Sequence, residues 1–173
     1  VTEEKLNFLL EMRASGRDRA QDYADKFGVP FFPGEKPWGV KVDVAMPCAT
    51  QNEVDLEEAK KIIANGTKYY IEVANMPTTE DALNLLIDTD GIIVAPSKAV
   101  NAGGVCVSGL EMSQNSQRLS WTAEEVDEKL HTAMINIHKH SVEAAEKYGL
   151  GYNLVAGANI AGFMKVSRAM MAQ

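Results

Sequence analysis

Three short apolar runs, each followed by a polar turn and a helical pattern, organise the middle of the chain. The runs are Val42–Met46, Tyr69–Ala74 and Ile92–Ala95, and apolar positions at helical spacing separate them over 55–65 and 78–87. Strands that alternate with helices predict right-handed crossovers and a parallel sheet. We therefore predict an α/β fold, with a parallel sheet of three or more strands, flanking helices and long C-terminal helices.

Capping signals place several helices. Thr78 is predicted to cap the helix that follows it, and Thr122 with Glu125 forms a capping-box pattern before a helix that runs to about Tyr148. A last helix is predicted over about 160–171. Two shorter helices, over 1–13 and 17–27, precede a loop rich in Pro and Gly.

Polar and glycine residues follow each of the three predicted strands. The loops carry Ala49-Thr50-Gln51, Asn75 and Asn101-Ala102-Gly103-Gly104. Carboxyl ends of parallel strands share one edge of a sheet, so we expect these loops to lie side by side, where open α/β folds bind ligands. An Asn side chain supplies both a donor and an acceptor to an amide or ribose, although Asn is also common in turns. The Gly pair admits a close ligand or forms a plain strand-to-helix turn.

Serine, histidine and cysteine residues of this chain lack the neighbouring sequence motifs that would indicate nucleophilic catalysis or metal binding. No G-x-S-x-G surrounds Ser108, so its hydroxyl either binds a ligand or satisfies backbone amides at a helix start. The histidines His131, His138 and His140 have no metal-ligand spacing with Cys, Asp or Glu, and no metal site is predicted. Cys106 is expected to pack rather than to react.

The charge and the cysteine content of the chain argue against some classes of binding partner and cellular compartment. The net charge is −7 and no basic cluster stands out, which argues against nucleic acid and anionic membrane surfaces as partners. No apolar run is long enough to span a bilayer, and no signal peptide is visible. Cys48 and Cys106 show no disulfide framework, which indicates a reduced, cytoplasmic protein. The chain opens on Val1 without Met, so we expect a part of a longer protein.

Five motifs in order closely resemble the glutamate dehydrogenase family, of the bacterial hexameric type, over essentially the whole chain. The motifs are Pro47-Cys48-Ala49-Thr50-Gln51-Asn52-Glu53, Ala74-Asn75-Met76-Pro77-Thr78-Thr79, Asn101-Ala102-Gly103-Gly104-Val105, Ser108-Gly109-Leu110-Glu111-Met112-Ser113-Gln114-Asn115 and Gly157-Ala158-Asn159-Ile160-Ala161-Gly162-Phe163. The resemblance implies oxidative deamination of L-glutamate to 2-oxoglutarate and ammonia with NAD or NADP, in a homo-hexamer. It also implies a C-terminal portion, with a partial Rossmann-like dinucleotide-binding domain over 1–120 and helices over 121–173 that return toward a substrate domain.

The resemblance also implies roles for particular residues. Ala49, Thr50 and Gln51 would lie along the cofactor, and Asn75 and Asn101 near its nicotinamide end. The positions that would border the glutamate side chain are Gly104, Val105 and Ser108, with the serine hydroxyl reaching the distal carboxylate.

The family's catalytic lysine and aspartate match no residue of this chain, so no catalytic residue is predicted in it. A G-x-G-x-x-G phosphate turn is also absent from the sequence. Many relatives have Gly at the position of Val73, a mild departure. The choice between NAD and NADP stays open.

Two other interpretations stay open. One is a fragment of a branched-chain or aromatic amino-acid dehydrogenase, against which the hydroxyl of Ser108 argues, because it suits an acidic substrate better than an apolar one. The other is a non-catalytic nucleotide-binding or assembly module.

Overall fold

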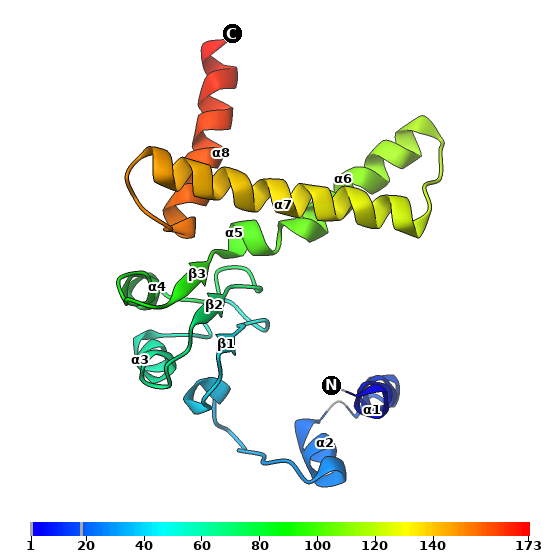
Figure 1. Cartoon of the computed structure of the whole chain (residues 1–173). Coiled ribbons are helices and arrows are strands. Elements are labelled where there is room, and N and C mark those ends of the chain that lie inside the picture. Colours follow the sequence, from blue (N-terminus) through cyan, green and yellow to red (C-terminus); the bar gives the residue numbers. More distant parts are fainter. Residues whose placement is uncertain (1, 18) are drawn as a thin grey trace. The chain divides into compact units, whose positions relative to one another are not determined.

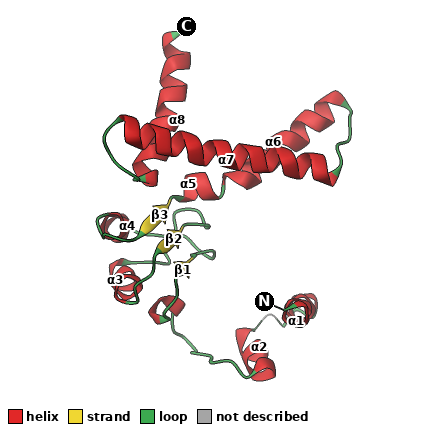
Figure 2. Ribbon diagram, viewed as in Figure 1, coloured by secondary structure: helices red, strands yellow, loops and turns green. Residues whose placement is uncertain are grey.

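Three short strands form a parallel sheet in the computed structural model, with their order in the sheet following the chain (Figures 1 and 2). They are β1 (Val44–Ala45), β2 (Tyr69–Ile71) and β3 (Ile93–Ala95). Helix α3 (Leu56–Ala64) connects β1 to β2, and α4 (Glu80–Ile87) connects β2 to β3. The predicted parallel α/β arrangement is confirmed, with strands shorter than the apolar runs that predicted them.

One face of this sheet carries the core. The strand residues on it are Ala45, Tyr70 and Val94, each less than 9% exposed. They belong to one buried cluster with residues of the helices and loops: Trp38, Val54, Ala59, Ile62, Ala82 and Leu86. Side chains alternate between the two faces of a strand. Val44, Tyr69 and Ile93, which are in register with one another, therefore share the opposite face, where they are 37–44% exposed.

The cap of α4 differs from the prediction. Thr79, not Thr78, is the N-cap residue of α4. The Thr78 side chain is buried, and its hydroxyl instead contacts Tyr70 and Glu72. The hydroxyl of Thr79 does not bond to the backbone at the start of α4 either, because it donates to Oδ1 of Asp81.

The Gly pair lies inside a helix rather than in a turn before one, which corrects the sequence interpretation. After β3 the chain forms α5 (Ser97–Val100) and then α6 (Ala102–Gln117), so Gly103 and Gly104 lie in the first turn of α6. A Cβ on Gly103 would lie 3.3 Å from Leu130 Cδ1 on the next helix, whereas a Cβ on Gly104 would meet nothing within 4 Å. The first glycine therefore serves helix packing, and the second leaves surface open.

The two long C-terminal helices are α7 (Ala123–Lys147) and α8 (Leu154–Met171). The predicted capping box of Thr122 and Glu125 is confirmed at the start of α7. Helix α8 begins earlier than predicted, because the side chain of Asn153 accepts from the backbone N–H of Ala156 and caps it there. Among the described residues, no helix is both long and apolar enough to cross a membrane.

The chain divides into two compact units, Val1–Pro37 and Trp38–Gln173, and the sheet belongs to the second. The first unit contains α1 (Glu3–Ala14) and α2 (Ala20–Phe27). Aromatic rings of α1 and α2 pack together in this unit. The ring centroids are 5.5 Å apart for Phe8 and Phe27 and 4.7 Å apart for Tyr23 and Phe27. A short 3₁₀ helix, η1 (Pro37–Gly39), follows. The structure describes all residues except Val1 and Asp18. The helices predicted over 1–13 and 17–27 each include one of these two positions, and that part of each prediction lies outside the described residues.

Candidate functional site at the carboxyl edge of the sheet

Backbone hydrogen bonds join the loop after β1 to the loop after β2. The carbonyl of Pro47 accepts from the backbone N–H groups of Val73, at 3.1 Å, and of Ala74, at 2.9 Å. Farther along the same loops, Asn52 N–H donates to the carbonyl of Met76 at 2.9 Å. The two loops therefore form a continuous surface at the carboxyl ends of β1 and β2.

Asn101 joins the third loop to this surface. Its side-chain nitrogen donates to the carbonyl of Val73 at 3.2 Å and to Oδ1 of Asn75 at 2.7 Å. Because a carbonyl can only accept, the amide nitrogen of Asn101 must face Val73, and Oδ1 of Asn75 must then face that nitrogen. The expected convergence is confirmed for Asn75 and Asn101, which come from different strand ends and are in direct contact.

An open face of α6 begins at this amide pair. Gly104, Val105 and Ser108 follow Asn101 by three, four and seven positions, a spacing that places all four on one side of a helix. Val105 is 73% exposed, and Gly104 and Ser108 are exposed as well. Ser108 lies beyond the first turn of α6, where backbone N–H groups already have partners within the helix. It therefore does not serve the helix start, the second of the two roles open to it from sequence.

The loops after β1 and β2, together with Asn101, form what we call the rim of the site. Ala49, Thr50 and Gln51 lie on the first of these loops and are exposed. The backbone N–H of Ala49 donates to Oε1 of Glu53 at 2.9 Å, which closes the loop on itself. No hydrogen bond among the described residues joins Thr50 or Gln51 to Asn75 or Asn101. The structure thus brings the two asparagines together and leaves these three residues on the neighbouring loop.

Sequence reasoning missed a buried polar cluster directly beneath the rim. The hydroxyl of Thr78 donates to Oε1 of Glu72 at 2.7 Å, and the hydroxyl of Tyr70 lies 2.7 Å from the same Thr78 oxygen. Oε2 of Glu72 accepts from the backbone N–H of Ser97 at 3.0 Å. Since the single proton of Thr78 is donated to Glu72, Tyr70 must be the donor to Thr78. Burial raises the pKa of Tyr70 well above its usual value, and the nearby Glu72 charge raises it further.

A family model described as Glutamate/Leucine/Phenylalanine/Valine dehydrogenase matches residues 3–173. The chain belongs to this family. It is 74% identical over its whole length to the NAD-specific glutamate dehydrogenase of Clostridium symbiosum and 53% identical over 99% of its length to the NADP-specific glutamate dehydrogenase of Salmonella typhi. A solved glutamate dehydrogenase structure superimposes on 99% of the chain with a TM-score of 0.95 at 74% identity. The chain spans 38% of the length of each of these relatives.

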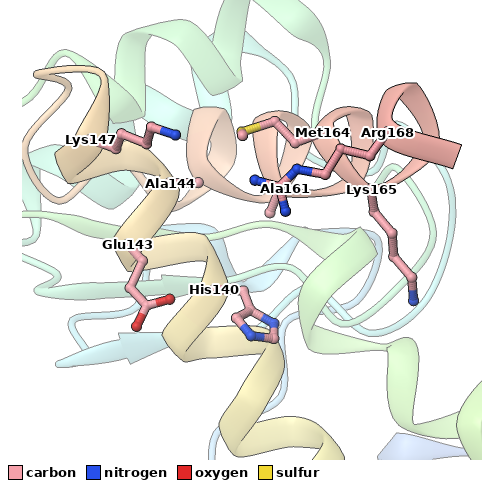
Figure 3. Close-up of a pocket in the computed structure, with 8 residues that line it drawn as sticks. All are labelled: His140, Glu143, Ala144, Lys147, Ala161, Met164, Lys165 and Arg168. Atoms are coloured by element: carbon pink, nitrogen blue, oxygen red, sulfur yellow. The ribbon is translucent and has the colours of Figure 1, made fainter. Parts of the chain in front are cut away.

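The chain also has a cavity between α7 and α8 (Figure 3), and its lining residues all come from these two helices. It has a volume of about 460 Å³ and contains none of the residues that the sequence assigned to cofactor or substrate. The basic side chains of Lys147, Lys165 and Arg168 are among the residues that line it. In the part of the chain that the structure describes, no three His, Cys, Asp or Glu residues are grouped to hold a metal ion.

Proposed function

We propose that this chain is the C-terminal portion of a glutamate dehydrogenase, which oxidatively deaminates L-glutamate to 2-oxoglutarate and ammonia with NAD or NADP. The observation that carries the proposal is the contact of Asn75 with Asn101 beside the open face of α6. Membership of the family and relatives named NAD-specific and NADP-specific glutamate dehydrogenase support it. These names favour glutamate over a branched-chain or aromatic amino acid.

The amide pair fits the carboxamide of a nicotinamide. Asn101 uses its side-chain nitrogen for Val73 and Asn75, so its Oδ1 still accepts, and the side-chain nitrogen of Asn75 still donates. A carboxamide presents one NH₂ group and one carbonyl, which complement this remaining acceptor and donor. A bound nicotinamide would supply the hydride acceptor, and Asn75 and Asn101 would orient its ring. Ala49, Thr50 and Gln51 on the adjacent loop would line the rest of the cofactor.

The face of α6 suits a dicarboxylate. The exposed hydroxyl of Ser108 would donate to the distal carboxylate, a charge-assisted hydrogen bond of the stronger kind. Gly104 leaves room for the substrate chain because nothing lies within 4 Å of where its Cβ would be. Val105 would contact the methylene groups.

The proposal extends to the organisation of the complete protein. Residues 1–120 would belong to its dinucleotide-binding domain and 121–173 would lead toward its substrate domain, in a homo-hexamer in the cytoplasm. The exposed row of Val44, Tyr69 and Ile93 supports a larger fold, because parallel sheets are normally covered on both faces. The free cysteines Cys48 and Cys106 suit a reducing compartment.

Titrating NAD⁺ into the ¹⁵N-labelled chain tests the nicotinamide contact. We expect saturable shifts of the side-chain amide signals of Asn75 and Asn101 and of the backbone amide of Gly104. The variant N101A should weaken this binding, and N136A, at an exposed position on α7, should leave it unchanged. No saturable shift, or equal affinity in N101A and the unaltered chain, would contradict the proposal and favour a non-catalytic module.

A further inference from the structure

Glu72 is a buried carboxylate without a cationic partner. It is 4% exposed, and among the described residues no ion pair involves it. A buried charge is costly unless hydrogen bonds replace its hydration. Here one oxygen accepts from Thr78 and the other from the backbone of Ser97. Both oxygens of the carboxylate are therefore committed to the loops at the edge of the sheet.

These two hydrogen bonds reach the segments that carry the amide pair. Thr78 follows Asn75 by three residues, so the bond from Thr78 back to Glu72 closes the loop that contains Asn75. Ser97 is the first residue of α5, a helix without a side-chain cap, and Asn101 is the C-cap residue at its other end. The carboxylate of Glu72 takes the place of the missing cap and holds the start of that helix against β2.

We propose that Glu72 is a positioning residue that sets the geometry of Asn75 and Asn101. A single carboxylate links the Asn75 loop and the helix that ends at Asn101, so it defines the spacing across which the two amides meet. The inference rests on the proposed function, because this spacing matters for binding only if the amide pair holds a nicotinamide. Glu72 itself lies beneath the rim and acts through the two asparagines.

Substitutions along this hydrogen-bond chain distinguish a positioning role of Glu72 from a role in packing alone. In E72Q, the new NH₂ group can donate to Thr78, whose hydroxyl then donates to Tyr70, while the amide oxygen still accepts from Ser97. Both links survive with the direction of the hydroxyl chain reversed. In E72M, a side chain of similar length has no acceptor, and both links are lost. T78V removes only the link to the Asn75 loop.

The first readout is the side-chain amide signals of Asn75 and Asn101 in the ¹⁵N-labelled chain without ligand. We expect E72M to shift both, T78V to shift Asn75 more than Asn101, and E72Q to leave both near their original positions. Y70F is the matched control, because it removes the hydroxyl at the far end of the chain and neither link of Glu72. If E72M does not fold, T78V and E72Q decide the question on the same signals.

The second readout is NAD⁺ affinity. We expect a loss of about tenfold in E72M, roughly the size of one hydrogen bond lost between an asparagine amide and the nicotinamide, with E72Q close to the unaltered chain. Unchanged asparagine signals in E72M and T78V, or equal losses in E72Q and E72M, would overturn the inference. If the unaltered chain binds no NAD⁺, the proposed function fails, whereas the asparagine signals still support or overturn the role of Glu72.

Discussion

The buried hydroxyl of Tyr70 shows how one side chain couples stability to ionisation. Tyr70 has no exposed surface and donates to Thr78, which in turn donates to Glu72. Loss of the phenolic proton would remove the first donor of this chain and place a second negative charge near Glu72. The folded protein therefore holds the tyrosine in its neutral form.

We expect the stability of the chain to fall at alkaline pH through Tyr70. Burial raises the pKa of Tyr70 in the folded state, so above the ordinary tyrosine pKa of about 10 the unfolded state loses this proton first. The unfolded state then binds fewer protons than the folded state, and the free energy of unfolding decreases as the pH rises. Urea unfolding between about pH 8 and pH 11 measures this slope.

The variant Y70F is the comparison, because it cannot ionise at this position. Its stability should be lower at neutral pH, where a hydrogen bond is missing, and should decline less steeply above about pH 10. Parallel profiles for the two proteins would contradict the assignment of the alkaline slope to Tyr70.

Two pairs of helices depend on glycine at their contact. Gly103 admits Leu130 and Met134 of α7 against α6. Gly157 of α8 lies still closer to α7, since its Cβ would be 2.0 Å from the carbonyl oxygen of Ser141. A clash with backbone cannot be relieved by rotating a side chain, so the α7–α8 contact requires this glycine.

We expect G157A to destabilise the chain by about 3 kcal/mol, because the added methyl group forces α7 and α8 apart. G162A is the matched control on the same helix, where nothing lies within 4 Å of the new Cβ. Alanine is the better helix former, so G162A should be neutral or stabilising by up to about 1 kcal/mol. Denaturant midpoints measure both, and similar losses in the two variants would contradict the close helix contact.

At the scale of the whole molecule, the proposed function gives this chain only one side of a reaction site. The predicted site residues are amides, two hydroxyls, glycine and small apolar groups, and none of these residue types titrates near neutral pH to act as a general acid or base. Lys98, on the helix that precedes Asn101, donates to Asn159 of α8. Hydride transfer also needs both reactants held in a fixed orientation, which one side of a site does not supply.

We therefore expect the 173-residue chain alone to show no turnover of glutamate with NAD or with NADP. Reduction of the nicotinamide, followed by absorbance, measures this, and a full-length glutamate dehydrogenase assayed in parallel confirms that the assay works. Turnover by the pure chain would show that the residues described here suffice for catalysis.

The sequence by itself determined the features that depend on local pattern and on topology. Apolar runs and helical spacing specified a parallel sheet, and the capping box at Thr122 specified the start of α7, because these signals act within a few residues. The meeting of Asn75 and Asn101 also followed, since the carboxyl ends of parallel strands share an edge.

Only the tertiary structure decided which partner each of several similar groups took. Thr78 and Thr79 are alike in sequence, as are Gly103 and Gly104. In the fold, Thr78 alone of its pair contacts Tyr70 and Glu72, and Gly103 alone of its pair lies against Leu130 of α7. In the sequence alone, Glu72 resembles an ordinary surface glutamate; only the fold places Ser97, the first residue of α5, against it. A buried charge is stable only where such donors converge, and that convergence exists only in the folded chain.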